Sequence, residues 1–183
     1  MTQNKTSKLV TTAVFIALAS VLSLIRVFKM PMGGSVTLLS MLPIALLSLK
    51  YGARWGFFSA FIYSLVQLLL DLPETMSWGL TPAVLAGTFF LDYIGAFTAL
   101  GFCGIFGKNS TKSIVSGIAL AMVTRFLFHF LSGVILFSSW AWEGWNPSVY
   151  SLCYNGLFML PEMIFTIIGA LILFNVSSLK KHL

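Results

Sequence analysis

The segment from Thr124 to Gly133 reads TRFLFHFLSG and places Arg125 and His129 one helical turn apart inside a long apolar run. Two acids, Asp92 and Glu162, interrupt other apolar runs in the same way. Ionisable side chains are costly inside a membrane, so each of these positions is a candidate functional residue. An acid and a histidine could hold a cation, exchange a proton, or join a structural ion-pair network.

The composition of the chain is that of a membrane protein. Of its 183 residues, 58% are hydrophobic and only 9% are charged, and the mean hydropathy is +0.94. Soluble domains carry about 25% charged residues, so the sequence predicts an all-α integral membrane protein in a lipid bilayer. The net charge of +6 does not indicate nucleic-acid binding, because the basic residues gather at the ends of the apolar segments.

Six apolar segments are candidates for membrane-spanning helices, each of which needs roughly 17 to 25 residues. We expect six helices in one domain over residues 1–183. Their expected ranges are 9–27, 35–49, 54–72, 81–106, 112–139 and 147–178. A signal peptide is the rival interpretation of the first segment, because Lys5 and Lys8 precede it and Ala17–Ala19 resembles a cleavage site.

The basic residues predict the orientation of these helices. Counted through six spans, four groups fall on one side: Lys5 with Lys8, Lys50 with Arg54, Lys108 with Lys112, and Lys180 with Lys181. The positive-inside rule therefore predicts a protein of the cell membrane with both termini in the cytoplasm. Arg26 and Lys29 are the exception, in an opposite loop. The opposite loops also contain three acids, Asp71, Glu74 and Glu143.

The rise per residue of a helix places the polar residues of the spans in two layers. At about 1.5 Å per residue, Asp92, His129 and Asn155 lie roughly 12 to 16 Å below the outer surface, on three different helices. Arg125 and Glu162 lie deeper, at roughly 21 to 22 Å. We therefore expect Arg125 and Glu162 to form a buried ion pair beneath the upper layer.

The upper layer combines an acid with aromatic side chains. The neighbouring aromatic residues are Tyr93, Phe130, Phe137, Tyr150 and Tyr154. An acid lined by aromatic faces suits an organic cation, through charge and cation–π attraction. The tryptophans of the last outer loop could also contact a ligand, but the position of Trp140, Trp142 and Trp145 favours a belt at the membrane interface.

Two other motifs bear on energy coupling and on partners. The segment GFCGIFGKNS departs from the phosphate-loop pattern at Phe102 and Asn109, so we expect no ATPase activity in this chain. The sequence has no metal-ligand spacing, and we expect neither a metal nor a cofactor. Ala13 and Ala17 lie one turn apart, and such small-residue faces let helices approach closely in lipid.

Four segments together resemble a known family: GGSVTLLSMLPI at 33–44, LDYIGAF at 91–97, HFLSGVILF at 129–137 and YSLCYNG at 150–156. The chain resembles the thiamine-specific substrate-binding (S) components, or ThiT family, of energy-coupling factor (ECF) vitamin transporters. The resemblance covers nearly the whole chain. It implies the S-component fold of six helices, with a pocket near the outer face that is closed by the loop after the first helix.

The resemblance also implies roles for individual residues. Those implied to bind thiamine are Asp92, Tyr93, Arg125, His129, Gly133, Phe137, Tyr150 and Asn155. Tyr150 lies off the Asn155 face by helical spacing, so we expect an irregular helix start there. The best-known member has Glu, Trp and Lys at the positions of Asp92, Phe137 and Arg125, and a Trp at the position of Gly34. Ala13 and Ala17 match the motif that docks S components on a transmembrane coupling subunit.

The resemblance implies a subunit that captures thiamine from outside and depends on a coupling subunit and two ATPase subunits for import. An S component for another small vitamin or a thiamine precursor is the alternative within this class. The alternative from another class is an intramembrane enzyme that uses Asp92 and His129 as an acid–base pair. No nucleophile or catalytic motif accompanies that pair, which argues against the enzyme.

Overall fold

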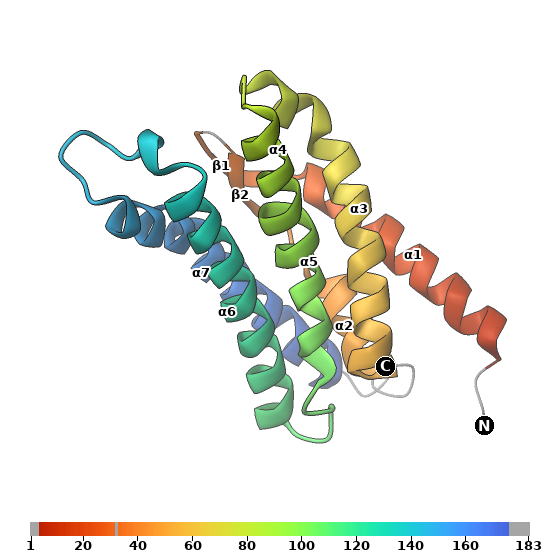
Figure 1. Ribbon diagram of the computed structural model, residues 1–183. Helices are drawn as coiled ribbons and strands as arrows, with labels where there is room; N and C mark the ends of the chain where they lie inside the picture. The colour runs from red at the N-terminus through yellow and green to blue at the C-terminus, as the bar shows by residue number, and fades with distance from the viewer. Residues whose placement is uncertain (1–3, 32, 176–183) are drawn as a thin grey trace.

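The computed structural model describes residues 4–31 and 33–175, which form six helices and one two-stranded hairpin (Figure 1). The helices are α1 (Lys5–Leu24), α2 (Leu42–Tyr51), α3 (Ala53–Ser77), a fourth composite helix, α6 (Thr111–Ile135) and α7 (Pro147–Asn175). The composite helix consists of α4 (Pro82–Thr88), η1 (Phe89–Gly95), α5 (Ala96–Thr98) and η2 (Ala99–Gly104). The antiparallel hairpin pairs β1 (Arg26–Met30) with β2 (Gly33–Thr37), and a short turn, η3 (Ser138–Trp140), follows α6.

Five of these helices are long and apolar enough to cross a membrane, which confirms the predicted helical membrane protein. The second predicted helix, 35–49, is wrong in its bounds and length. Its first residues form β2, and the helix that follows has only ten residues. Hydropathy alone cannot distinguish a strand from a helix here, because a short apolar run suits a buried strand as well as a helix. The predicted last helix extends to 178, and residues 176–178 lie outside the described part.

Local sequence signals mark the starts of four helices. The Asn4 side chain accepts a hydrogen bond from the Thr6 amide at the start of α1, and the Ser110 hydroxyl accepts one from the Ser113 amide at the start of α6. Pro82 and Pro147 stand in the first turns of α4 and α7, where proline is favoured because an amide N–H there would have no hydrogen-bond partner within the helix.

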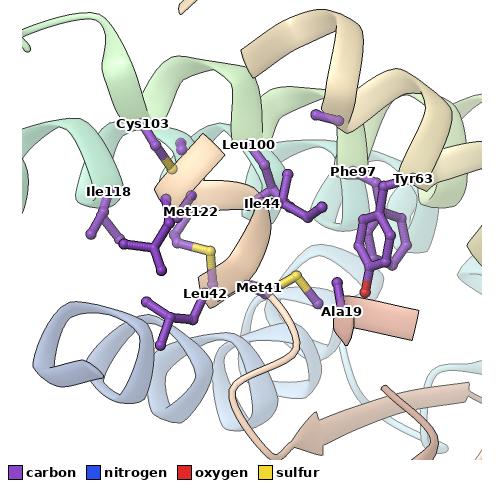
Figure 2. Close-up of a cluster of buried hydrophobic side chains, with 14 of the residues drawn as sticks. Ala19, Met41, Leu42, Ile44, Tyr63, Phe97, Leu100, Cys103, Ile118 and Met122 are labelled. Carbon is purple, nitrogen blue, oxygen red and sulfur yellow. The ribbon is translucent and has the colours of Figure 1, made fainter. Parts of the chain in front are cut away.

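The short helix α2 forms the centre of the protein and is buried from Leu42 to Leu49. Figure 2 shows its Ile44 beside Leu100 of η2 and close to Met122 of α6. The Ser48 hydroxyl of α2 donates to the carbonyl of Gly101 at 2.7 Å and accepts from the amide of Gly104 at 2.8 Å. A side chain at Gly104 would lie 2.1 Å from the Ser48 carbonyl oxygen, so this close crossing requires glycine.

The two ends of the helical bundle differ. The hairpin and the connections after α3 and α6 lie at one end, whereas the start of α1 and the turns after α2 and η2 lie at the other (Figure 1). The predicted basic groups at Lys5, Lys8, Lys50, Arg54, Lys108 and Lys112 therefore belong to one end of the bundle. Lys180 and Lys181 lie outside the described residues.

Candidate ligand-binding site

A cavity of about 180 Å³ lies at the hairpin end of the bundle. Its walls come from the end of α1, the hairpin, α3, the composite fourth helix, α6, η3 and α7. All eight residues that the sequence analysis assigned to a ligand line this cavity: Asp92, Tyr93, Arg125, His129, Gly133, Phe137, Tyr150 and Asn155. Sequence reasoning and the family resemblance thus identified residues that the fold brings together from the fourth helix, α6, the turn after α6 and α7.

Asp92 and His129 form the polar centre of the cavity. The Nδ1 atom of His129 lies 2.8 Å from Oδ1 of Asp92, and the Ser132 hydroxyl donates to Oδ2 of the same carboxylate. A carboxylate only accepts hydrogen bonds, so Nδ1 of His129 donates to it, and in the neutral imidazole Nε2 is then an acceptor. Nε2 is buried and has no hydrogen-bond partner among the described residues. The centre therefore offers a negative charge and one open acceptor.

The fourth helix departs from regular α geometry where it lines the cavity. Residues Phe89–Gly95 form a π-helical segment, a feature that is frequent at functional sites. The wider turn brings Thr88, Asp92, Tyr93 and Phe97 to the cavity, with spacings of four and five residues. In a regular helix, at about 100° per residue, Tyr93 and Phe97 would lie about 140° and 180° away from Thr88. The Tyr93 hydroxyl lies 3.1 Å from the Thr75 hydroxyl, which fixes the ring against α3.

α7 contributes a polar and an aromatic stripe. Asn155 donates through Nδ2 to the Ser151 carbonyl at 2.9 Å and to the His129 carbonyl at 3.3 Å, which ties α7 to α6. Tyr150 lies beside Tyr154 with ring centroids 5.8 Å apart, and both line the cavity. The expected irregular start of this helix is wrong. α7 is regular from Pro147. Tyr150 reaches the cavity because the face of α7 that lines the cavity is wider than the single row of residues that contains Asn155.

Aromatic rings from two segments, the end of α3 and the connection after α6, meet at the cavity. Phe137 lies 4.7 Å from Trp140 and 6.4 Å from Trp78, measured between ring centroids. Trp140 lines the cavity and can contact a ligand there. Trp142 and Trp145 are exposed, and the predicted belt at the membrane interface stays a prediction. Sequence reasoning missed Trp78, although its place just after a long apolar run was an available signal.

Arg125 does not pair with Glu162, contrary to the expected buried ion pair. None of the ion pairs between described residues joins them. Arg125 is 6% exposed, its Nη1 lies 2.9 Å from the Met41 sulfur, and its guanidinium stacks 4.2 Å from the centre of the Phe97 ring. The chain from Thr37 to Met41 contacts both side chains, and Glu162 accepts from Thr37 instead. Arg125 and Glu162 thus have similar predicted depths in the membrane but do not form an ion pair.

Charged residues at the mouth of the cavity pair with one another. Arg26 lies 2.8 Å from Asp71 and 3.1 Å from Glu74, and Lys29 lies 2.9 Å from Glu74. Arg26, Asp71 and Glu74 also line the cavity. These pairs join β1 to the end of α3. They also explain why Arg26 and Lys29 depart from the basic pattern of the other end, since their charges are balanced locally.

The arrangement suits the binding of an organic cation better than catalysis. Asp92 carries a negative charge beside aromatic faces, which attract cations. The described residues include no cluster of three His, Cys, Asp or Glu side chains that could hold a metal ion. Asp92 and His129 could exchange a proton across 2.8 Å, which leaves acid–base chemistry open on geometry alone.

Comparison with known proteins settles the family. The family model described as thiamine transporter protein matches residues 9–182. The thiamine transporter ThiT of Bacillus subtilis is 31% identical over 181 residues, which cover 91% of this chain and 90% of the relative. ThiT of Lacticaseibacillus paracasei is 26% identical over 149 residues, covering 75% of this chain and 72% of that protein.

A solved structure supports the fold independently. The structure of ThiT from Listeria monocytogenes superposes with a TM-score of 0.76 at 24% identity, covering 95% of this chain and 96% of that one. The architecture described above is therefore shared with a solved structure at nearly full length. From the family match over most of its length and its identity to a relative that it covers almost completely, this chain belongs to the thiamine transporter protein family.

Proposed function

We propose that this chain is the thiamine-binding subunit of an energy-coupling factor transporter and that it captures thiamine from outside the cell. Its family and its relatives are transporters, so the chain is a transporter and not an enzyme. The observation that carries the choice of ligand is the Asp92 carboxylate in a cavity rimmed by Phe137, Trp78 and Trp140. Thiamine has a permanently positive thiazolium ring and a hydrogen-bonding aminopyrimidine, and both match this lining.

In the proposed complex, the residues implied by the family resemblance contact different parts of thiamine. The thiazolium lies between His129 and the Phe137 face, within the field of Asp92. The exocyclic amine of the pyrimidine donates to the open Nε2 of His129, because that atom is a buried acceptor without a partner among the described residues. Tyr150 and Asn155 contact the polar edge of the ligand from α7, and Arg125 closes the floor of the cavity.

Import requires partners in this proposal. The chain has no phosphate loop, so ATP hydrolysis comes from two ATPase subunits, linked through a transmembrane coupling subunit. Ala13 and Ala17 are both exposed on α1 and form the proposed docking face. The hairpin end faces outward and the basic end faces the cytoplasm, which places both termini inside.

Calorimetric titration of the purified protein tests this proposal. Thiamine should bind at one molecule per chain, and the separate pyrimidine and thiazole halves should bind far more weakly. If a thiamine precursor or another small vitamin bound more tightly than thiamine, that compound would replace it as the substrate. In liposomes that contain the chain alone, internal ATP should cause no accumulation of thiamine. Sustained accumulation would contradict the proposal that this chain needs partner subunits for transport.

A further inference from the structure

Strand β2 forms one wall of the cavity but is poorly held by its own hairpin. Gly33, Gly34, Ser35 and Thr37 of β2 line the cavity. The pairing with β1 shifts register twice, between Arg26 and Phe28 and between Lys29 and Met30. In the described sheet, β2 has a strand neighbour on one side only. Isolated two-stranded hairpins are marginally stable, so this wall requires support from elsewhere.

That support comes from one face of α7. Tyr154, Phe158 and Glu162 follow each other at intervals of four residues, which places them on one side of the helix. The Tyr154 hydroxyl donates to the Pro31 carbonyl at the tip of the hairpin. The Phe158 ring lies under Gly34, where an added side-chain carbon would stand 2.8 Å from it. Glu162 holds the last residue of β2, Thr37.

The contact between Glu162 and Thr37 is polar and is buried in the interior of the protein. Oε1 of Glu162 accepts hydrogen bonds from both the backbone amide and the hydroxyl of Thr37, the latter at 2.6 Å. The Thr37 hydroxyl also lies 2.5 Å from that of Ser40. Leu39, between them, has a φ of 59°, a conformation that residues with a side chain rarely adopt. The carboxylate therefore fixes the place where the strand ends and a tight turn begins.

The burial of this acid points to a specific role. Glu162 is 1% exposed, and its Oε2 has no hydrogen-bond partner among the described residues. Burying a carboxylate is costly unless it is well paired, and Arg125 does not pair with it here. Glu162 itself is not among the residues that line the cavity, whereas Thr37 is. Glu162 therefore does not touch a ligand in this cavity, whereas the residue that it holds can.

We propose that Glu162 is a positioning residue for ligand binding: it fixes Thr37, and through it the β2 wall, without touching the ligand. This inference rests on the proposed function, since thiamine is the ligand whose binding reports on the wall. A positioned wall keeps a bound ligand in place, so loss of Glu162 should act mainly on the rate of dissociation. A residue that only stabilised the fold would lower the melting temperature and leave dissociation from the folded protein unchanged.

The test measures thiamine dissociation by dilution of the loaded, purified protein, together with its melting temperature. Glu162→Leu removes the acceptor and should accelerate dissociation by about tenfold or more, because two buried donors of Thr37 lose their partner. Glu162→Gln retains an oxygen acceptor and should stay within about threefold of the wild-type rate. The matched control is Thr166→Val, one turn further along α7. Thr166 is fully buried and donates only to the Glu162 carbonyl, so this variant should not change dissociation.

A double-mutant cycle guards against misfolding and against direct effects of Thr37. Thr37→Val removes the hydroxyl donor and should accelerate dissociation in the wild-type and Glu162→Gln backgrounds, where the acceptor is present, but add little to Glu162→Leu. Additive effects of Thr37→Val and Glu162→Leu would overturn the inference, as would a wild-type rate in Glu162→Leu. A Gln variant as fast as the Leu variant would assign the effect to charge, which also overturns it. Failure of the wild-type protein to bind thiamine would instead refute the proposed function.

Discussion

Replacing Asp92 with asparagine removes the charge of the cavity while keeping its shape. Asparagine can still accept from Nδ1 of His129, now at 2.8 Å from Oδ1, and the Ser132 hydroxyl can reverse its direction. Two opposite charges at ~4 Å and an effective dielectric constant of ~20 attract by about 4 kcal/mol. Because desolvation offsets part of this, we expect a loss of about 2 to 4 kcal/mol, or roughly 30- to 1000-fold in Kd.

Calorimetric titration with thiamine measures this loss against two controls. Asp71→Asn removes the same charge from the cavity lining, but Asp71 pairs with Arg26 at 2.8 Å and is partly exposed, so its loss should stay below about tenfold. Phe137→Leu removes one aromatic face and should cost about 1 to 2 kcal/mol. If Asp92→Asn bound thiamine within tenfold of wild type, or lost no more than Asp71→Asn, Asp92 would not be the partner of the cation.

Two further substitutions test the docking face on α1 and the packing of the hairpin against α7. Ala13→Trp should leave thiamine affinity intact and abolish uptake by cells, since a bulky ring blocks close helix approach. Leu18→Trp, on an exposed part of α1 about 140° away, is its control and should transport normally. Gly34→Ala should lower the melting temperature by an amount that corresponds to about 1 to 3 kcal/mol, because the new methyl group meets the Phe158 ring at 2.8 Å. Gly144→Ala, at a positive φ of 80° in open space (29° at Gly34), shows the cost of backbone strain without a clash, and equal losses would contradict the packing of Gly34 on Phe158.

The sequence predicted the long helices and the ionisable residues of the cavity for the same physical reason, whereas the full set of predicted cavity residues came from the family resemblance. Charges are scarce in the apolar spans, so Asp92, Arg125 and His129 stood out without any knowledge of the fold. Counting residues from the membrane surface placed Asp92, His129 and Asn155 in one layer. The structure joins them through the 2.8 Å contact of Asp92 with His129 and the 3.3 Å bond from Asn155 to the His129 carbonyl.

What the sequence could not predict depends on local geometry and on competition between partners. The π-helical segment around Asp92 changes which residues face the cavity, and the composite helix that contains it has a mean hydropathy of 1.6, within the range of the other long helices. The predicted helices 9–27 and 35–49 include the two ends of the hairpin at 26–37, because the apolar runs continue into both strands. Glu162 had two candidate partners at similar depth, and the amide and hydroxyl of Thr37 occupy it in place of Arg125. Depth counts cannot resolve such a choice.

The most direct test of the account is mass spectrometry of the small molecules that co-purify with the wild-type protein from thiamine-supplied cells. The account predicts thiamine, chemically unchanged, at up to one molecule per chain. It also predicts a clear loss of that thiamine from the Asp92→Asn variant prepared in the same way. A different compound in wild type, or thiamine retained equally by the Asp92→Asn variant, would contradict the claim that this cavity binds thiamine through Asp92.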